Sequence, residues 1–265
     1  RLEGQPLPPP IAALFTAQRA ASQQATVQAL WEAERCAAAL AGSGITAILL
    51  KGSAYAAAGL PPAPGRQIGD LDILVPRASL DATEHALLAA GWEWVKADPY
   101  DQAYYREHMH ELPPLIHAER DRMIDVHHTI LPLTARPRPD AAALVAAALP
   151  VALPGADERA PSTLAILCPT DMICHAAAHL IADGDLAGGL RNVWDIDRLL
   201  RHFAQEDADF WHALTLRAQQ HDLWFAVHRA ARLAHFLYET PLPESWVIRD
   251  GSDPLFLAHL LLLSR

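Results

Sequence analysis

The sequence has 265 residues with a formal net charge of −10; 51% of the residues are hydrophobic and 20% are charged. This composition is typical of a globular protein that is long enough to bury a core. The acidic excess argues against general nucleic-acid binding, because such binding requires Lys and Arg to neutralise phosphates. It does not exclude a single nucleotide held through a metal ion.

The three cysteines are scattered and form no CxxC pair, which indicates a reducing compartment. The most apolar stretch, 141–153, is interrupted by Pro150 and is too short to span a bilayer. No charged-then-apolar signal pattern opens the sequence. We therefore expect a cytoplasmic protein without a membrane partner.

A Pro-rich arm over 1–10 is expected to precede a long helix over 11–41, which Gly42 and Gly44 end in a turn. The core candidates of this helix are Leu14, Val27, Leu30 and Trp31. The next segments are predicted to be a buried strand at 45–50, a short helix at 53–58 and a loop at 59–69.

Alternation of polar and apolar residues predicts a strand over 70–75, and a helix follows at 80–90. Further strands of the same sheet are predicted at 92–95, 104–110, 114–117 and 122–130. After a Pro-rich crossing the pattern becomes helical, at 164–181, 190–203, 210–220 and 224–238. We expect three parts: an arm and helix (1–44), an α/β core (45–135) and a mainly helical domain (136–265).

The motif Asp70-Leu71-Asp72 lies on a predicted strand, where alternate side chains share a face. Asp70 and Asp72 then point the same way, and their like charges repel each other. Such a pair is reasonable when a divalent cation sits between the carboxylates, although two solvated aspartates at a strand edge would give the same pattern.

A second strand carries Asp125 and His127 on one face, with Ile124 and Val126 on the other. If this strand neighbours the first, Asp125 completes a carboxylate triad that could hold Mg²⁺. Taken alone, Asp125 could equally be a surface residue.

Upstream, Lys51-Gly52-Ser53 forms a predicted strand-to-helix turn. Gly52 would allow close approach of the backbone to phosphate, and Ser53 could cap the helix and contact phosphate. Lys51 and Arg66 flank the Asp-x-Asp motif and could neutralise a triphosphate, although each could also be ordinary surface charge.

Together these residues resemble the polymerase-beta-type nucleotidyltransferase superfamily. The runs Leu50-Lys51-Gly52, Asp70-Leu71-Asp72 and Ile124-Asp125-Val126-His127, with Arg66 between the first two, are more closely similar to an uncharacterised bacterial nucleotidyltransferase-like family. The gap from Gly52 to Asp70 is longer than in the superfamily pattern, and the turn has one Gly rather than two.

The resemblance implies an α/β (α+β) nucleotidyltransferase core with a mixed sheet, followed by a helical C-terminal domain. It implies that Asp70, Asp72 and Asp125 are the metal ligands and catalytic residues. In the helical part, the i, i+4 pair His175 and His179 could bind a metal but is better explained as polar positions that line a cleft or are paired in the core. By resemblance, His175, His179 and Asp195 face the nucleotide or the acceptor.

The sequence therefore predicts a metal-dependent nucleotidyltransferase that moves a nucleoside monophosphate from an NTP to an unidentified acceptor. Mg²⁺ (or Mn²⁺) is the expected cofactor and ATP the expected NTP. Lys51, Gly52, Ser53, Arg66, His127, His175 and His179 are the predicted nucleotide-binding residues. The acceptor would be a small molecule or a protein. Two alternatives remain: a catalytically silent binding or regulatory module of the same fold, and a His-based metal phosphohydrolase.

Overall fold

The computed structural model describes residues 7–154, 163–182, 186, 188–248 and 251–263. In these ranges, seven strands form one sheet in the order β3-β4-β5-β2-β1-β7-β6. The strands are β1 (Ala47–Leu49), β2 (Leu71–Leu74), β3 (Trp92–Trp94), β4 (Leu115–His117), β5 (Met123–His127), β6 (Leu149–Pro150) and β7 (Leu164–Ile166). The β2–β5 and β1–β7 pairs are parallel and the other pairs antiparallel, which confirms the predicted mixed sheet.

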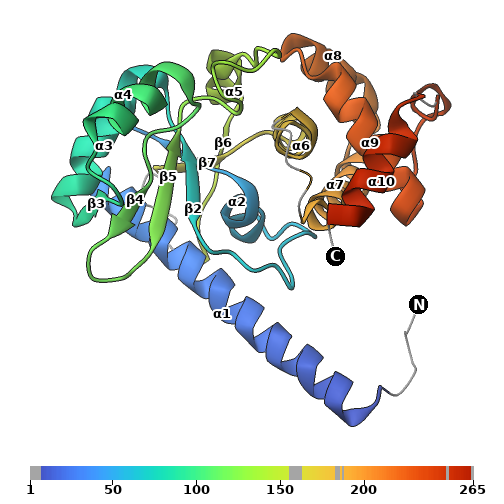
Figure 1. Ribbon diagram of the computed structural model, residues 1–265, viewed down its shortest axis with the longest axis horizontal. Coiled ribbons are helices and arrows are strands. Elements are labelled where there is room, and N and C mark those ends of the chain that lie inside the picture. The colour runs from blue at the N-terminus through green and yellow to red at the C-terminus, as the bar shows by residue number, and fades with distance from the viewer. Residues whose placement is uncertain (1–6, 155–162, 183–185, 187, 249–250, 264–265) are drawn as a thin grey trace.

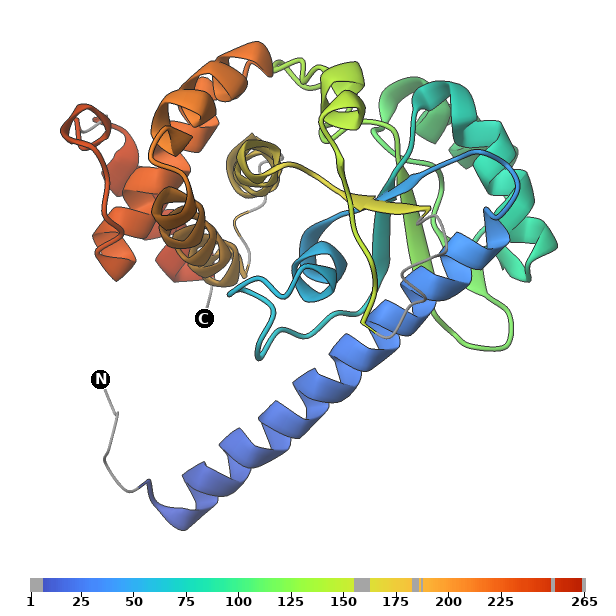
Figure 2. The ribbon, with the colours of Figure 1, turned by 180° about the vertical axis from the view of Figure 1, so that it is seen from behind.

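Helices surround this sheet (Figure 1). They are α1 (Pro9–Ala39), α2 (Lys51–Ala57), α3 (Leu80–Ala89), α4 (Pro99–His108), α5 (Ala141–Ala146), α6 (Pro169–Ala177), α7 (Gly189–Glu206), α8 (Phe210–Gln220), α9 (Trp224–Tyr238) and α10 (Asp253–Leu263). α3 and α4 lie on one side of the sheet and α6 to α10 on the other, as both views show (Figures 1 and 2). No helix of the described ranges has the length and apolar character needed to cross a bilayer.

The central strands β1 and β2 form the middle of the hydrophobic core. Ile48, Leu49, Ile73 and Leu74 are at most 1% exposed. Every residue of both strands is buried, which is typical of strands covered on both faces. A carboxylate on β2 is therefore held by a rigid element.

The long helix α1 is confirmed, but its predicted core residues are mostly wrong. Leu14 and Val27 are 66% and 68% exposed, Trp31 is 46% exposed, and Leu30 packs partly buried against the core. The helix runs past the body of the protein, and its first half points away from it (Figure 2). Small residues such as Ala33 and Cys36, in the second half, make the buried contact instead.

Two other predicted elements differ from the structure. The predicted strand 104–110 is wrong, because Tyr104 lies in α4, which begins where Asp98 accepts a hydrogen bond from the backbone N–H of Tyr100. The predicted helix 164–181 is divided: Leu164–Ile166 is strand β7, and Pro169 begins α6. A π-helical turn at Ala178–Ala182 follows α6.

The helices predicted at 190–203, 210–220 and 224–238 are confirmed as α7, α8 and α9. The part of the chain after residue 136 is mainly helical in the described ranges, and it also contributes β6 and β7 to the sheet. A division into domains at residue 135 stays a prediction.

Candidate active site

Three carboxylates lie together near the middle of the sheet. Asp70 immediately precedes β2, Asp72 lies within β2, and Asp125 lies within β5. β2 and β5 are parallel neighbours with Asp72 opposite Asp125, so these two side chains share a face. Each of the three residues offers an oxygen within 4.8 Å of those of the others. The predicted convergence of the three carboxylates is confirmed. Asp72 is 3% exposed, Asp125 is half-buried and Asp70 is exposed, so the cluster opens to solvent.

Asp72 is the carboxylate with direct partners. Lys51 Nζ donates a hydrogen bond to Asp72 Oδ1 at 2.7 Å, and His127 Nε2 lies 3.1 Å from the same oxygen. Burial acts to raise the pKa of Asp72, but the hydrogen bond with His127 and the positive charge of Lys51 outweigh it and hold this pKa well below its usual range. Repulsion within the Asp-x-Asp motif is therefore offset at Asp72 by two neighbours.

Asp125 has the opposite electrostatic environment. Burial, followed by the negative charges of Asp72 and Glu111, raises the pKa of Asp125 to about 7. Two neighbouring aspartates, 53 positions apart in sequence, thus have pKa values shifted in opposite directions. A cation placed between them would favour the ionised form of Asp125.

The turn before α2 directs a lysine at the carboxylates. Lys51 has φ of 48°, a left-handed conformation that costs a non-glycine residue about 1 kcal/mol or more. The charge of Asp72 raises the pKa of Lys51 even though burial alone would lower it. An unfavourable backbone conformation is thus retained at the residue that contacts the triad.

Gly52 has a packing role that the sequence did not reveal. A Cβ at this position would lie 2.7 Å from Arg66 Nε and 3.0 Å from Ile68 Cγ1. The glycine therefore lets Arg66 pass close to the start of α2. Arg66 continues to an ion pair with Asp195 of α7, which also pairs with Arg191 Nε at 2.9 Å.

Ser53 is not the helix cap, which corrects the prediction. The N-cap of α2 is Leu50, and Ser53 Oγ donates to the Leu50 carbonyl at 2.9 Å. The Ser53 residue is 1% exposed. Its predicted contact with phosphate receives no support from this geometry.

A pocket of about 50 Å³ lies beside the triad, and Lys51 borders both. The pocket is lined by Lys51, Tyr55, Arg66, His175, Ala176, His179, Asn192 and Asp195. The structure thus brings together the sequence-predicted His175, His179 and Asp195 with Lys51 and Arg66. Burial holds the pKa of His175 well below its usual value, so its ring is neutral.

Two residues next to the triad were missed by sequence reasoning. Glu111 forms an isolated β-bridge with His127, and its Oε2 lies 3.4 Å from His127 Nδ1. The His110 ring lies near that of His127, with 5.1 Å between the ring centroids and 31° between the ring planes. The local sequence offers only the His110-Glu111 dipeptide as a signal, because the contact with β5 depends on the course of the loop between α4 and β4.

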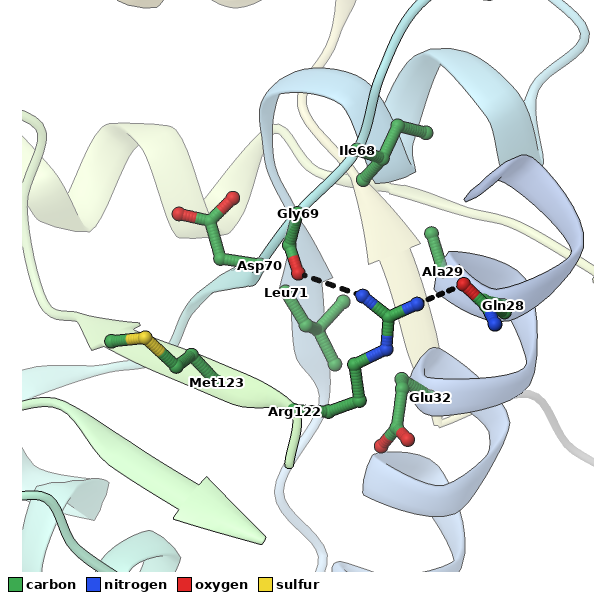
Figure 3. Close-up of a pocket in the computed structure, with 9 residues that line it drawn as sticks. All are labelled: Gln28, Ala29, Glu32, Ile68, Gly69, Asp70, Leu71, Arg122 and Met123. Carbon is green, nitrogen blue, oxygen red and sulfur yellow. Dashed lines mark hydrogen bonds between the residues drawn. The ribbon is translucent and has the colours of Figure 1, made fainter. Parts of the chain in front are cut away.

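One arginine, Arg122, attaches α1 to the segment that carries Asp70. Arg122 Nη1 donates to the Gly69 carbonyl at 3.3 Å, and its other terminal nitrogen donates to Gln28 (Figure 3). The small cavity around Arg122 has a volume of about 10 Å³, enough for a water molecule at most. The Asp70 carboxylate points away from Arg122 (Figure 3). This side of the sheet therefore supports the backbone of the triad rather than forming a ligand site.

A mixed sheet with carboxylates on two neighbouring strands, and a third just before one of them, fits the α/β nucleotidyltransferase-like class of fold. A family model described as "uncharacterised nucleotidyltransferase" matches residues 1–239. The chain belongs to this family, as its motifs predicted. Comparisons with curated proteins and with solved structures gave no match.

Proposed function

We propose that this protein is a metal-dependent nucleotidyltransferase that moves a nucleoside monophosphate from an NTP to an acceptor hydroxyl, phosphate or amine. The observation that carries the proposal is the convergence of Asp72 of β2, Asp125 of β5 and Asp70, which immediately precedes β2. Membership of a nucleotidyltransferase family supports the same reaction class.

The triad fits a hard divalent cation. Its donor atoms are all carboxylate oxygens, which suit Mg²⁺ or Mn²⁺ rather than a softer metal. Burial, together with the negative charges of Asp72 and Glu111, raises the pKa of Asp125, and a cation at the triad would relieve both effects. We assign Asp70, Asp72 and Asp125 as the ligands. A bound Mg²⁺ would neutralise charge on the phosphates of the NTP.

The cationic and polar residues of the neighbouring pocket are assigned to the nucleotide. Lys51, which reaches both Asp72 and the pocket, would contact a triphosphate oxygen. Arg66 is held in place by Asp195 and adds positive charge at the same wall. The neutral His175 ring and the Asn192 amide can supply hydrogen bonds.

Asp125 is the proposed general base, which takes the proton that the acceptor substrate loses. It is half-buried, in a cluster that opens to solvent, so an acceptor group could approach its carboxylate. ATP is the first NTP to test. The acceptor is assigned to a small molecule or a protein in the cytoplasm, since the net charge of −10 disfavours general nucleic-acid binding.

The test is thermal unfolding with Mg²⁺ and each of the four NTPs. A ligand that binds only the folded state raises its melting temperature, so wild type should shift with one metal–NTP pair and Asp70→Asn should not. Asp209→Asn is the matched control, because Asp209 is exposed at the start of α8, far along the chain from the triad.

If no metal–NTP pair raises the melting temperature of wild type, the enzyme proposal is wrong and the alternative of a catalytically silent module is favoured. Equal shifts of the melting temperature in wild type and Asp70→Asn would indicate that the metal binds elsewhere than at the triad. Loss of the shift in Asp209→Asn as well would indicate general damage to the fold.

A further inference from the structure

A second group of metal-ligand side chains lies against the triad, on its His127 side. His110, Glu111 and His127 each offer a ligand atom within 4.8 Å of the other two. Glu111 Oε2 lies 3.4 Å from His127 Nδ1 and 3.7 Å from His110 Nε2. This set has two imidazole nitrogens and one carboxylate, whereas the triad has oxygen donors alone.

The spacing of these atoms is close to that of a coordination shell. Four ligands at about 2.0–2.1 Å from a tetrahedral Zn²⁺ lie roughly 3.4 Å from one another. The separations of 3.4 and 3.7 Å around Glu111 Oε2 are near this value. Small side-chain rotations would therefore be enough to close the shell around an ion.

The His127 ring also has a nitrogen that lacks a hydrogen bond. His127 is 3% exposed, and its Nδ1 makes no hydrogen bond within the described part of the chain. Buried polar atoms are nearly always paired, so an unpaired one needs an explanation. This Nδ1 faces Glu111 Oε2 at 3.4 Å, the place where a cation would bind.

The opposite nitrogen of the same ring is already oriented. His127 Nε2 lies 3.1 Å from Asp72 Oδ1. A histidine that binds a metal through one nitrogen commonly donates its other N–H to a carboxylate, which fixes the tautomer and the ring plane. Asp72 supplies that partner, so a proton on Nε2 would leave the Nδ1 lone pair directed at Glu111.

From this geometry we infer that His110, Glu111 and His127 form a second divalent-metal site of the Zn²⁺ class, separate from the carboxylate triad. Three protein ligands leave a fourth position for water or a substrate oxygen, as in catalytic rather than structural zinc sites. A metal ion in this site would also fix the orientation of the His127 ring, and through it the position of the Asp72 carboxylate. The inference concerns metal binding and does not depend on nucleotide transfer.

The test is a titration of the full chain with Co²⁺ alone, followed by visible absorption and without nucleotide or Mg²⁺. Four-coordinate Co²⁺ with nitrogen ligands absorbs strongly, whereas an octahedral oxygen site absorbs weakly. We expect the strong band in wild type and its displacement by Zn²⁺. His110→Gln and Glu111→Gln should each weaken Co²⁺ binding at least about tenfold, because a ligand is lost.

Two further variants serve as controls. His108→Gln removes an exposed histidine at the end of α4 and should leave the band unchanged. Asp70→Asn removes a carboxylate of the triad and should also leave it unchanged. Thermal unfolding of each variant checks the fold. The hydrogen bond of 2.8 Å from the backbone N–H of His128 to the His110 carbonyl does not involve the side chain, so His110→Gln retains it.

The inference is overturned if wild type shows no strong band, or if the band persists with unchanged affinity in both His110→Gln and Glu111→Gln. It is also overturned if the band disappears in Asp70→Asn, since Co²⁺ would then be bound by the triad. The Co²⁺ titration contains no nucleotide, and the proposed function is tested by thermal unfolding with metal and NTP, so the failure of one proposal is distinguishable from the failure of the other.

Discussion

The carboxylates of the triad and those buried among the C-terminal helices differ in how their charge is balanced. Asp171 of α6 is fully buried and accepts two hydrogen bonds of 2.6 Å from Arg217, with His221 Nε2 at 3.0 Å. Each of its oxygens has a cationic partner. In the described residues, Asp70 and Asp125 have neither a hydrogen bond nor an ion pair from their side chains.

Asp197 of α7 repeats the pattern of the helical part. It is fully buried, accepts from Arg201 Nε and from Thr240 Oγ1 at 2.7 Å each, and is also paired with Arg198. Arginine thus balances the charge of both buried aspartates, Asp171 and Asp197. At the triad, a single lysine and a histidine contact one of three carboxylates, which leaves negative charge available to a ligand.

The largest effect is expected from breaking a balanced carboxylate. Asp171→Asn leaves Arg217 without its ionic partner and should lower the free energy of unfolding by about 3 kcal/mol, as is usual when one member of a buried ion pair is removed. Urea denaturation measures the change. Asp70→Asn, in an exposed and unpaired residue, should alter stability by no more than about 0.5 kcal/mol. Similar losses in the two variants would contradict the comparison.

The next effect concerns Asp125 and pH. The unfolded chain loses this proton near pH 4, whereas the folded chain keeps it until about pH 7. Because the folded state binds more protons at Asp125 between these values, the contribution of Asp125 to the stability of wild type falls as the pH rises from about 4 to about 7. Asp125→Asn removes this loss.

Asp125→Asn should therefore be more stable than wild type by roughly 2 kcal/mol near pH 8, after allowance for solvent screening, and nearly equal to it near pH 4. Denaturation curves at both pH values, without metal, give the comparison. Saturating Mg²⁺ should remove the advantage of the variant, since the ion stabilises the ionised carboxylate. If Asp125→Asn is more stable than wild type by the same amount at both pH values, the charge of Asp125 is not the cause of the difference.

The smallest effect is expected at Lys51. Lys51→Ala should weaken the binding of the metal–NTP pair about tenfold, or roughly 1.4 kcal/mol, because one cationic contact to phosphate is lost. Calorimetry measures the affinity. Lys96→Ala is the control, since Lys96 is exposed and contacts Asp98 and Asp101 away from the triad. Unchanged affinity in Lys51→Ala would show that Lys51 pairs with Asp72 and does not contact the nucleotide.

The triad could be predicted because strand alternation is a local rule. Asp72 and Asp125 each lie between buried apolar residues, and the parallel register of β2 and β5 then places them side by side. Glu111 could not be predicted in the same way, because its contact with His127 depends on a loop path that no short pattern encodes.

The errors in the fold have physical causes too. The aromatic residues around Tyr104 favour a strand, but Asp98 and Pro99 provide a capping side chain and a helix-starting proline, and these decided the outcome. Leu14 and Val27 have helical spacing, yet spacing alone does not say whether a partner surface exists. Nothing else in the described ranges covers that face of α1.

The most direct test of the central claim is a crystal soaked with Mn²⁺ and a non-hydrolysable NTP. The account predicts an anomalous peak at coordination distance from Asp70, Asp72 and Asp125, with the triphosphate between it and Lys51. A bound nucleotide with no Mn²⁺ at the triad, or Mn²⁺ bound only by His110, Glu111 and His127, would contradict the assignment of the triad as the active site.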